Sequence, residues 1–295
     1  MENVGVVIPA KNRPEKLEYC LTALARAREK LPFVVDVGDS SDTAKTSEAV
    51  RAVCKKFDFV RYHAHHGQKK DRDVGAARNF CAQVATAELL INVDDDVCVE
   101  SDAILRLFEA YQRGQGWRVV AGSVAFGKDW SEPVVMRPIG YGRKPRPGER
   151  PSFLVGAFFL YPRALALACP WNERIRVADD MFVGGLWRCK GVALLFEPQA
   201  RAFHDIQLRN HYVVEWQADQ IYANLFDALV ANPNIPRAFA YEFLGFAAGA
   251  KYWFRRPKTA WAYVAAWYRG HRALVRDWQY LKALVRQPLP EDRPR

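Results

Sequence analysis

The sequence contains no pair of cysteines at CxxC spacing and no apolar run long enough to cross a membrane. Its longest uncharged stretches near the C-terminus, 243–250 and 259–268, fall well short of the roughly 20 residues that a spanning helix needs. The N-terminus enters an apolar segment without a basic leader or a small-residue cleavage site. We therefore expect a cytoplasmic protein, which can also lie peripherally on the inner face of a membrane.

The composition limits the classes of protein that the chain can belong to. Half of its 295 residues are hydrophobic, which excludes a disordered chain and suffices for one large α/β core with a small appendage. The six cysteines are scattered through apolar patterns and are predicted to be reduced core residues. Lys and Arg exceed Asp and Glu by 43 to 33, which favours an anionic partner such as a membrane, a nucleic acid or a phosphorylated substrate.

Apolar runs alternate with amphipathic segments, which is typical of a mostly parallel sheet flanked by helices. We predict strands at 4–8, 33–37, 89–93, 119–124, 153–160 and 192–196, and helices near 15–29 and 102–111. A loop rich in Pro, Gly and Arg at 128–152 is long enough to form a lid or an acceptor-binding segment. Beyond His204 the sequence is rich in Trp, Tyr and Arg, so we predict an α/β domain at 1–207 and a helical C-terminal extension at 208–295.

Three carboxylates, Asp94, Asp95 and Asp96, directly follow the apolar run 89–93. Open α/β sheets bind ligands at the carboxyl ends of their strands. If the strand continues, Asp94 and Asp96 project to the same side and can hold a divalent cation and a ribose between them. The alternative is a solvated turn that caps the next helix.

Three other positions carry side chains suited to chemistry. Arg78, on a helix of small residues, can face an anionic group or a nucleobase, or it is a surface arginine. Asp179 and Asp180 begin an apolar helix, where one carboxylate can take a proton from a hydroxyl, although the helix dipole alone also favours acids there. His204 is either structural or a ligand for an ion such as Mn²⁺.

Taken in order, these patterns resemble family 2 glycosyltransferases with the GT-A fold over roughly Val4 to Asp205. Each pattern alone is weak, and their order carries the resemblance. The matching segments are Val6–Arg13 at the opening strand and loop, Asp39–Asp42 at the nucleobase turn, Gly75–Asn79 and Asp94–Asp96 at the helix and DxD element, and Gly156–Phe159, Trp171–Glu173, Asp179–Asp180 and His204 in the acceptor half.

The resemblance implies a role for individual residues within a GT-A catalytic domain. These are Pro9, Lys11, Asp39 and Arg78 near the nucleobase, Asp94 near the ribose, Asp95 beside it in donor binding, Asp96 with His204 as ligands of Mn²⁺ or Mg²⁺, and Asp180 as the general base. The nucleobase turn is one residue shorter than the usual form, which leaves Asp36 as an alternative to Asp39.

The implied function is inverting transfer of a sugar from a nucleotide-diphosphate donor to the hydroxyl of a saccharide or lipid-linked acceptor, in glycan or glycolipid biosynthesis. A sugar-1-phosphate nucleotidyltransferase should have a Gly-rich loop after its first strand, whereas Pro9–Arg13 contains no glycine. A non-catalytic nucleic-acid-binding protein would explain the basic segments 63–72 and 137–150, but not three adjacent aspartates. A glycosyltransferase that acts on DNA or another polyanion stays open.

One predicted face of the extension suggests contact with an anionic membrane. Apolar and aromatic residues recur there at helical spacing, and most of the basic residues lie off that face. The stripe consists of Trp267, His271, Leu274, Trp278, Leu281 and Val285. The alternative is that this stripe packs on the catalytic domain or on a second subunit.

Overall fold

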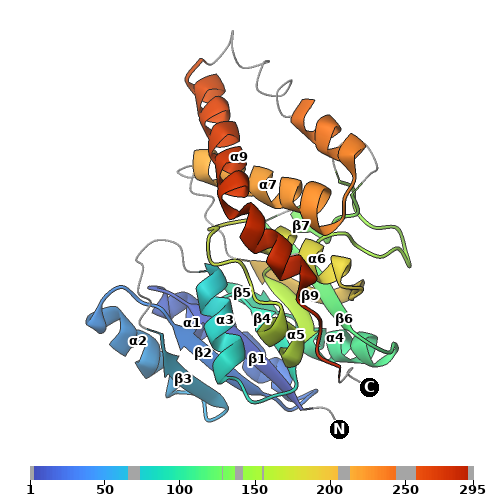
Figure 1. Ribbon diagram of the computed structural model, residues 1–295. Helices are drawn as coiled ribbons and strands as arrows, with labels where there is room; N and C mark the ends of the chain where they lie inside the picture. Colours follow the sequence, from blue (N-terminus) through green and yellow to red (C-terminus); the bar gives the residue numbers. More distant parts are fainter. Residues whose placement is uncertain are drawn as a thin grey trace.

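The computed structural model describes residues 3–65, 74–127, 129–136, 142–154, 156–204, 213–243 and 257–291. Within these residues, nine strands form one sheet in the order β3-β2-β1-β4-β8-β6-β9-β5, and β7 pairs with β6. Helices cover the sheet, and the last helices of the chain stand over one end of it (Figure 1). The predicted α/β fold is confirmed.

The first half of the sheet is parallel and ends at β4. Its strands and helices are β1 (Val4–Ala10), α1 (Pro14–Arg28), β2 (Val34–Asp39), α2 (Ala44–Cys54), β3 (Val60–Ala64), α3 (Val74–Val84) and β4 (Leu89–Val93). Each of β1, β2 and β3 is followed by a helix that returns the chain, as parallel pairing requires. The sequence analysis placed most of these elements but did not predict β3, whose side chains are mainly half-buried and polar.

The second half of the sheet is mixed, so the prediction of a mostly parallel sheet describes only the first half. Strand β8 pairs antiparallel with both β4 and β6, whereas β9 runs parallel to β6 and antiparallel to β5. The elements are β5 (Val97–Val99), α4 (Ala103–Gln112), β6 (Arg118–Phe126), β7 (Asp129–Ser131), β8 (Phe158–Pro162), α5 (Arg163–Ala168), α6 (Asp179–Cys189) and β9 (Ala193–His204).

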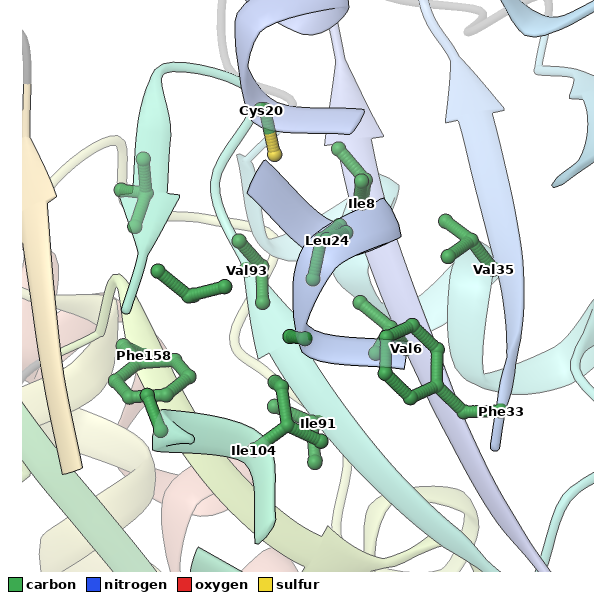
Figure 2. Packing of buried hydrophobic residues seen from close by; sticks show 14 of the residues in the cluster. Val6, Ile8, Cys20, Leu24, Phe33, Val35, Ile91, Val93, Ile104 and Phe158 are labelled. Carbon is green, nitrogen blue, oxygen red and sulfur yellow. The ribbon is translucent and has the colours of Figure 1, made fainter. Parts of the chain in front are cut away.

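Helix α1 shows how the apolar pattern produces the first core. Pro14 suits the first turn, where the missing N–H has no partner to lose, and four apolar residues follow at helical spacing. Cys20 and Leu24 pack there with Ile8 and Val93 (Figure 2). All six cysteines are unbonded thiols, and they are buried or half-buried, as predicted.

The C-terminal helices share a second core with the sheet. They comprise α7 (Val213–Phe226), the π-helical turn η1 (Asp227–Ala231), a helical segment at 235–243 and α9 (Pro257–Arg286). Tyr222 and Phe226 of α7 stack on Phe182 of α6. The predicted boundary between residues 207 and 208 lies outside the described residues.

The prediction that the stripe on the C-terminal helix faces a membrane is wrong for its central residues. Leu274 and Leu281 are buried in the second core, and Trp278 and Val285 pack against it. The apolar side of α9 therefore covers α7 and the catalytic domain, which was the alternative interpretation. In the described parts of the chain, no helix combines the length and the apolar character needed to span a bilayer.

Candidate active site

The three aspartates lie in a turn between β4 and β5, not on a continued strand. The Val97 N–H donates to the Asp94 carbonyl at 3.0 Å, which closes the turn. The expectation that Asp94 and Asp96 project to the same side assumed a continued strand, and the chain turns at these residues instead. Asp94 pairs with Arg78, whereas Asp95 and Asp96 pair with Arg13.

Arg78 connects Asp94 to the acidic pair at the start of α6. Its guanidinium donates to Asp94 at 3.0 Å and forms an ion pair with Asp179. Burial would lower the pKa of Arg78, but the charges of Asp179 and Asp94 raise it overall. The arginine is thus a permanent buried cation that connects residues distant in sequence.

Asp180 differs from its neighbour Asp179 because its carboxylate accepts from backbone groups and does not pair with Arg78. The N–H groups of Gly156 and Met181 donate to its two oxygens at 2.9 and 2.8 Å. Desolvation and the charge of Asp179 raise the pKa of Asp180 to about 6. The residue as a whole is half-buried. A carboxylate with this pKa is suited to accept a proton near neutral pH.

Gly156 allows this arrangement because it has no side chain. A Cβ at this position would lie 2.9 Å from the Cβ of Asp180. The Gly156 carbonyl accepts from Arg78 at 3.2 Å and from buried Asn92 at 2.8 Å. This residue therefore connects Asp180 to the strand that precedes the three aspartates.

A second cluster surrounds Asp95 and Asp96. Arg13, just after β1, forms ion pairs with both carboxylates, and the Lys11 N–H donates to Asp95 at 3.1 Å. Burial raises the pKa of Asp95 to about 7, although Arg13 and the Lys11 N–H act in the opposite direction. In the loop after β1, the charge of Arg13 and the N–H of Lys11 thus offset part of the negative charge of the acidic turn.

Asp96 and His204 fit a divalent cation as a pair. The His204 Nε2 lies 3.5 Å from Asp96 Oδ1, at the point where β5 pairs with the end of β9. Burial lowers the pKa of His204, despite the charges of Asp96 and Asp94, and therefore favours the neutral imidazole that binds metals. Among the residues that the structure describes, none forms a hydrogen bond with the buried Nδ1 of His204.

Two candidate ligands would leave most of a cation's coordination shell to other groups. In the residues that the structure describes, no three His, Cys, Asp or Glu side chains converge on one point. Magnesium commonly binds one or two carboxylates together with substrate phosphates, so an incomplete protein shell is compatible with a phosphate-bearing ligand. Asp205, next to His204, lies outside the described residues.

Three of the four predicted nucleobase residues, Pro9, Lys11 and Asp39, lie at or just after the ends of β1 and β2, whereas Arg78 lies on α3 and pairs with Asp94 and Asp179. Pro9 pairs in register with Gly38, and Lys11 Nζ lies 3.0 Å from Asp42. The Asp39 carboxylate is buried and accepts hydrogen bonds from the Ser41 N–H and from three hydroxyls, those of Ser41, Ser47 and Tyr62. Its acceptor positions are thus used within the fold.

Asp36, the alternative to Asp39, is also engaged within the fold. Arg61 binds its two oxygens at 2.8 and 2.6 Å, and the His63 Nε2 lies 2.8 Å from Oδ1. Beside the turn, His65 stacks on Phe80 with ring centroids 4.3 Å apart. Residues 66–73, which follow in the basic segment, lie outside the described residues, as do 137–141 of the predicted lid.

The structure thus brings seven of the nine predicted site residues into two linked clusters and adds three residues to them. The other two, Pro9 and Asp39, lie at the ends of β1 and β2. Arg13, Asn92 and Gly156 were not assigned a role from the sequence. Arg13 could have been found as a basic residue directly after the first strand. The roles of Asn92 and Gly156 depend on contacts 64 and 24 residues away, which no local pattern reports.

Arg78 thus joins the acidic turn that follows β4 to the acidic pair that begins α6. The sequence profile of glycosyl transferase family 2 matches residues 5–167, more than half of the chain. The chain therefore belongs to glycosyl transferase family 2. A comparison with curated proteins gives no match.

Solved structures with the same fold are GT-A glycosyltransferases. A mannosyltransferase, PcManGT from Pyrobaculum calidifontis in complex with GDP-Man and Mn²⁺, is similar with a TM-score of 0.59, 16% identity and coverage of 96% of this chain and 85% of that chain. Residues 1–349 of TarS from S. aureus are similar with a TM-score of 0.54 and 15% identity, and the match covers 96% of this chain and 88% of that chain. GalNAc-T7 with UDP, GalNAc and Mn²⁺ is similar with a TM-score of 0.61 and 15% identity, and the match covers 78% of this chain and 49% of that chain. At these identities the likeness establishes the fold alone.

Proposed function

We propose that this protein is an inverting glycosyltransferase that moves a sugar from a nucleotide-diphosphate donor to an acceptor hydroxyl and depends on Mn²⁺ or Mg²⁺. The observation that carries the proposal is the division of the acidic groups. Asp96 lies beside neutral His204, whereas Asp180 is half-buried with a raised pKa beside Arg78. One cluster suits a diphosphate with its cation, and the other suits proton transfer.

On the donor side, Asp96 and His204 would hold the cation, which supplies charge neutralisation for the departing diphosphate. Asp94 and Asp95 lie next to them and are proposed to contact the ribose and the rest of the donor. Lys11 and Pro9 border the nucleobase position. Asp39, whose carboxylate is saturated within the fold, is proposed to shape this turn through Ser41.

On the acceptor side, Asp180 takes the proton of the attacking hydroxyl. The acceptor oxygen forms a bond to the anomeric carbon, and the bond from that carbon to the diphosphate oxygen breaks. The leaving nucleoside diphosphate keeps the electron pair, and attack from the opposite face inverts the anomeric centre. Arg78 holds Asp179 and Asp94 in place around this step and keeps the local charge low.

The proposal is tested by adding UDP-, GDP- and dTDP-sugars to the full chain, with Mn²⁺ or with EDTA. A donor that binds only the folded protein raises its melting temperature, and a concentration 100 times Kd adds about 2.7 kcal/mol to the free energy of unfolding. We expect stabilisation by one class of donor, and only with the cation. No stabilisation or hydrolysis with any donor would contradict the proposal.

The raised pKa of Asp180 predicts the pH dependence of transfer. Only the ionised carboxylate can accept a proton, so the rate should fall as pH drops through the folded-state pKa of about 6. We expect log kcat/KM to rise with a slope near one below that pH and to level off above it. Measurement of transfer at saturating cation from pH 5 to 9 checks this, and a flat profile through pH 6 would contradict the assignment.

We propose further that the acceptor is confined to an anionic membrane, as a lipid-linked saccharide is. The outer face of α9 exposes Trp261, Val264 and Tyr268 at helical spacing, whereas the buried face covers the core. The segment 235–243 exposes Ile235, Phe239 and Phe243. Glu242 connects this segment to α9. Its carboxylate accepts a hydrogen bond from Trp267 Nε1 at 2.5 Å and lies 3.2 Å from His271 Nε2.

Charge complementarity supports a lipid surface as the occupant of this aromatic face. Exposed Arg269 and Arg272 lie on α9 among the aromatic residues, and the whole chain has a formal charge of +10. Each basic residue near an anionic leaflet contributes about 1 kcal/mol at low salt. Aromatic rings that lie between apolar and polar surroundings are typical of membrane interfaces.

The membrane proposal predicts that the full chain co-sediments with anionic liposomes at low salt and is released as salt rises. The double variant Phe239→Ser, Tyr268→Ser should lose most of this binding, because both side chains are more than half exposed and do not support the core. Tyr19→Ser is the matched control, since Tyr19 is an equally exposed aromatic residue on α1. Equal binding by the double variant, or salt-dependent binding to duplex DNA instead of liposomes, would contradict a lipid surface.

A further inference from the structure

The loop between α5 and α6 leads directly into Asp179 and Asp180. Ala178, the residue before the pair, has a left-handed backbone conformation with φ 59° and ψ 21°. Alanine rarely adopts this conformation, which persists only where surrounding contacts over-determine it. The contacts that hold this loop therefore also determine the direction in which Asp180 points.

Helix α7 supplies two of these contacts, directly before Ala178. One carboxylate oxygen of Asp219 accepts the backbone N–H groups of Arg176 and Val177 at 2.8 and 3.2 Å. Three residues further along the helix, the Tyr222 hydroxyl accepts from Asn172 at 3.1 Å. The loop is thus bound to one face of α7 at both of its ends.

Helix α9 supplies a second anchor through Asp277, whose side chain is fully buried. It accepts from Tyr222 at 3.3 Å and pairs with Arg174 of the loop at 2.6 Å and with Arg276 at 2.8 Å. Burial would raise the pKa of Asp277, but the hydrogen bonds from Arg276 and Arg174 lower it overall. This carboxylate therefore stays charged and bound to the loop.

A close helix crossing keeps the two anchors together. Helix α7 lies against both α9 and α6 (Figure 1). At the crossing, a Cβ on Gly270 of α9 would lie 2.8 Å from the Ala218 carbonyl of α7. The absence of a side chain at Gly270 lets the helices approach closely, next to Asp219.

We propose that Asp219 is a positioning residue for transfer, acting through the loop on Asp180. By holding the amides of Arg176 and Val177, it fixes the left-handed turn at Ala178 and aims Asp180 at the acceptor hydroxyl. Asp277 reinforces the same loop through Arg174. The C-terminal extension is then part of the acceptor half of the site. This inference rests on the proposed function, because it assumes that Asp180 is the base.

The test compares Asp219→Ala with Asp219→Asn in the full chain. Both amides donate to a single oxygen, so asparagine can keep these bonds while alanine cannot. Hydrogen exchange within the 174–181 segment should become about tenfold faster or more in Asp219→Ala, because the amides of Arg176 and Val177 lose their acceptor. We expect kcat to fall about tenfold or more, the donor Kd to stay within about twofold, and Asp219→Asn to restore most of both properties.

The control is Asp227→Asn, a variant in the same helical region. Asp227 is buried and pairs with Arg188 and Arg237, away from the loop before α6. It should lower the melting temperature without faster exchange at 174–181, which separates positioning from general loss of stability.

The two possible failures are distinguishable. Unchanged exchange in Asp219→Ala, or faster exchange with unchanged kcat, overturns the positioning role. Absence of transfer by the wild-type chain with every donor overturns the proposed function, and the exchange experiment then decides separately whether Asp219 anchors the loop.

Discussion

Replacement of Asp180 by asparagine is expected to reduce kcat by 10²- to 10⁴-fold, the range that general base catalysis typically contributes. The amide is nearly isosteric with the carboxylate but cannot take the proton of the acceptor hydroxyl. Donor affinity should stay close to that of the wild type, because the cation and the diphosphate are assigned to Asp96 and His204. Separate measurement of kcat and of the donor Kd by calorimetry checks the expected division.

The folded state should tolerate this substitution. Because the folded-state pKa of Asp180 is raised, the ionised side chain opposes folding at neutral pH. Its removal offsets the loss of one of the two backbone N–H hydrogen bonds, which the amide nitrogen of asparagine cannot accept. The neighbouring variant Asp179→Asn is the comparison, since it removes one partner of buried Arg78 and should lower the melting temperature. If Asp180→Asn transfers sugar within a few-fold of the wild type, Asp180 is not the base and Asp179 is the next candidate.

The fold was largely predictable because its apolar periodicity is strong. Val4–Ala10 and Leu89–Val93 are buried strands, and both appear in the sequence as apolar runs. The mixed second half was not predictable, because the antiparallel position of β8 between β4 and β6 is set by tertiary packing. The same limit applies to β5, whose three residues pair with the end of β9.

The candidate site was predictable as a set of residues but not as a geometry. The order of motifs identified Arg78, Asp96, Asp180 and His204, whereas their partners depend on the fold. The acidic triplet shows this limit: alternation along a strand was assumed, but the chain turns at Asp94–Asp96. Asp94 pairs with Arg78, whereas Asp95 and Asp96 share Arg13, and Asp96 also lies beside His204. The anchoring by Asp219 was equally inaccessible, since it crosses from α7 to a loop 43 residues earlier.

Replacement of Asp96 by alanine is expected to abolish the metal-dependent part of donor binding. Asp96 is the carboxylate that lies beside His204, so its loss leaves the cation with one candidate protein ligand. Loss of an outer-shell partner typically costs a metal site about 10- to 100-fold in affinity, and loss of a direct ligand should cost at least as much. Titration of the productive donor by calorimetry, with Mn²⁺ and with EDTA, measures this difference.

Matched variants make the result specific to the cation. Glu18→Gln removes the carboxylate of an exposed ion pair between Glu18 of α1 and Lys56, which follows α2, and it should leave metal-dependent binding unchanged. His204→Ala should reduce the same metal-dependent increment, although its stacking on Phe126 adds a cost in stability that thermal unfolding reports. Arg13 still pairs with Asp95 when Asp96 is removed, so the loop after β1 keeps an anchor and the fold should survive. If Asp96→Ala binds every productive donor with undiminished metal dependence, the cation is held elsewhere and the assignment of Asp96 is wrong.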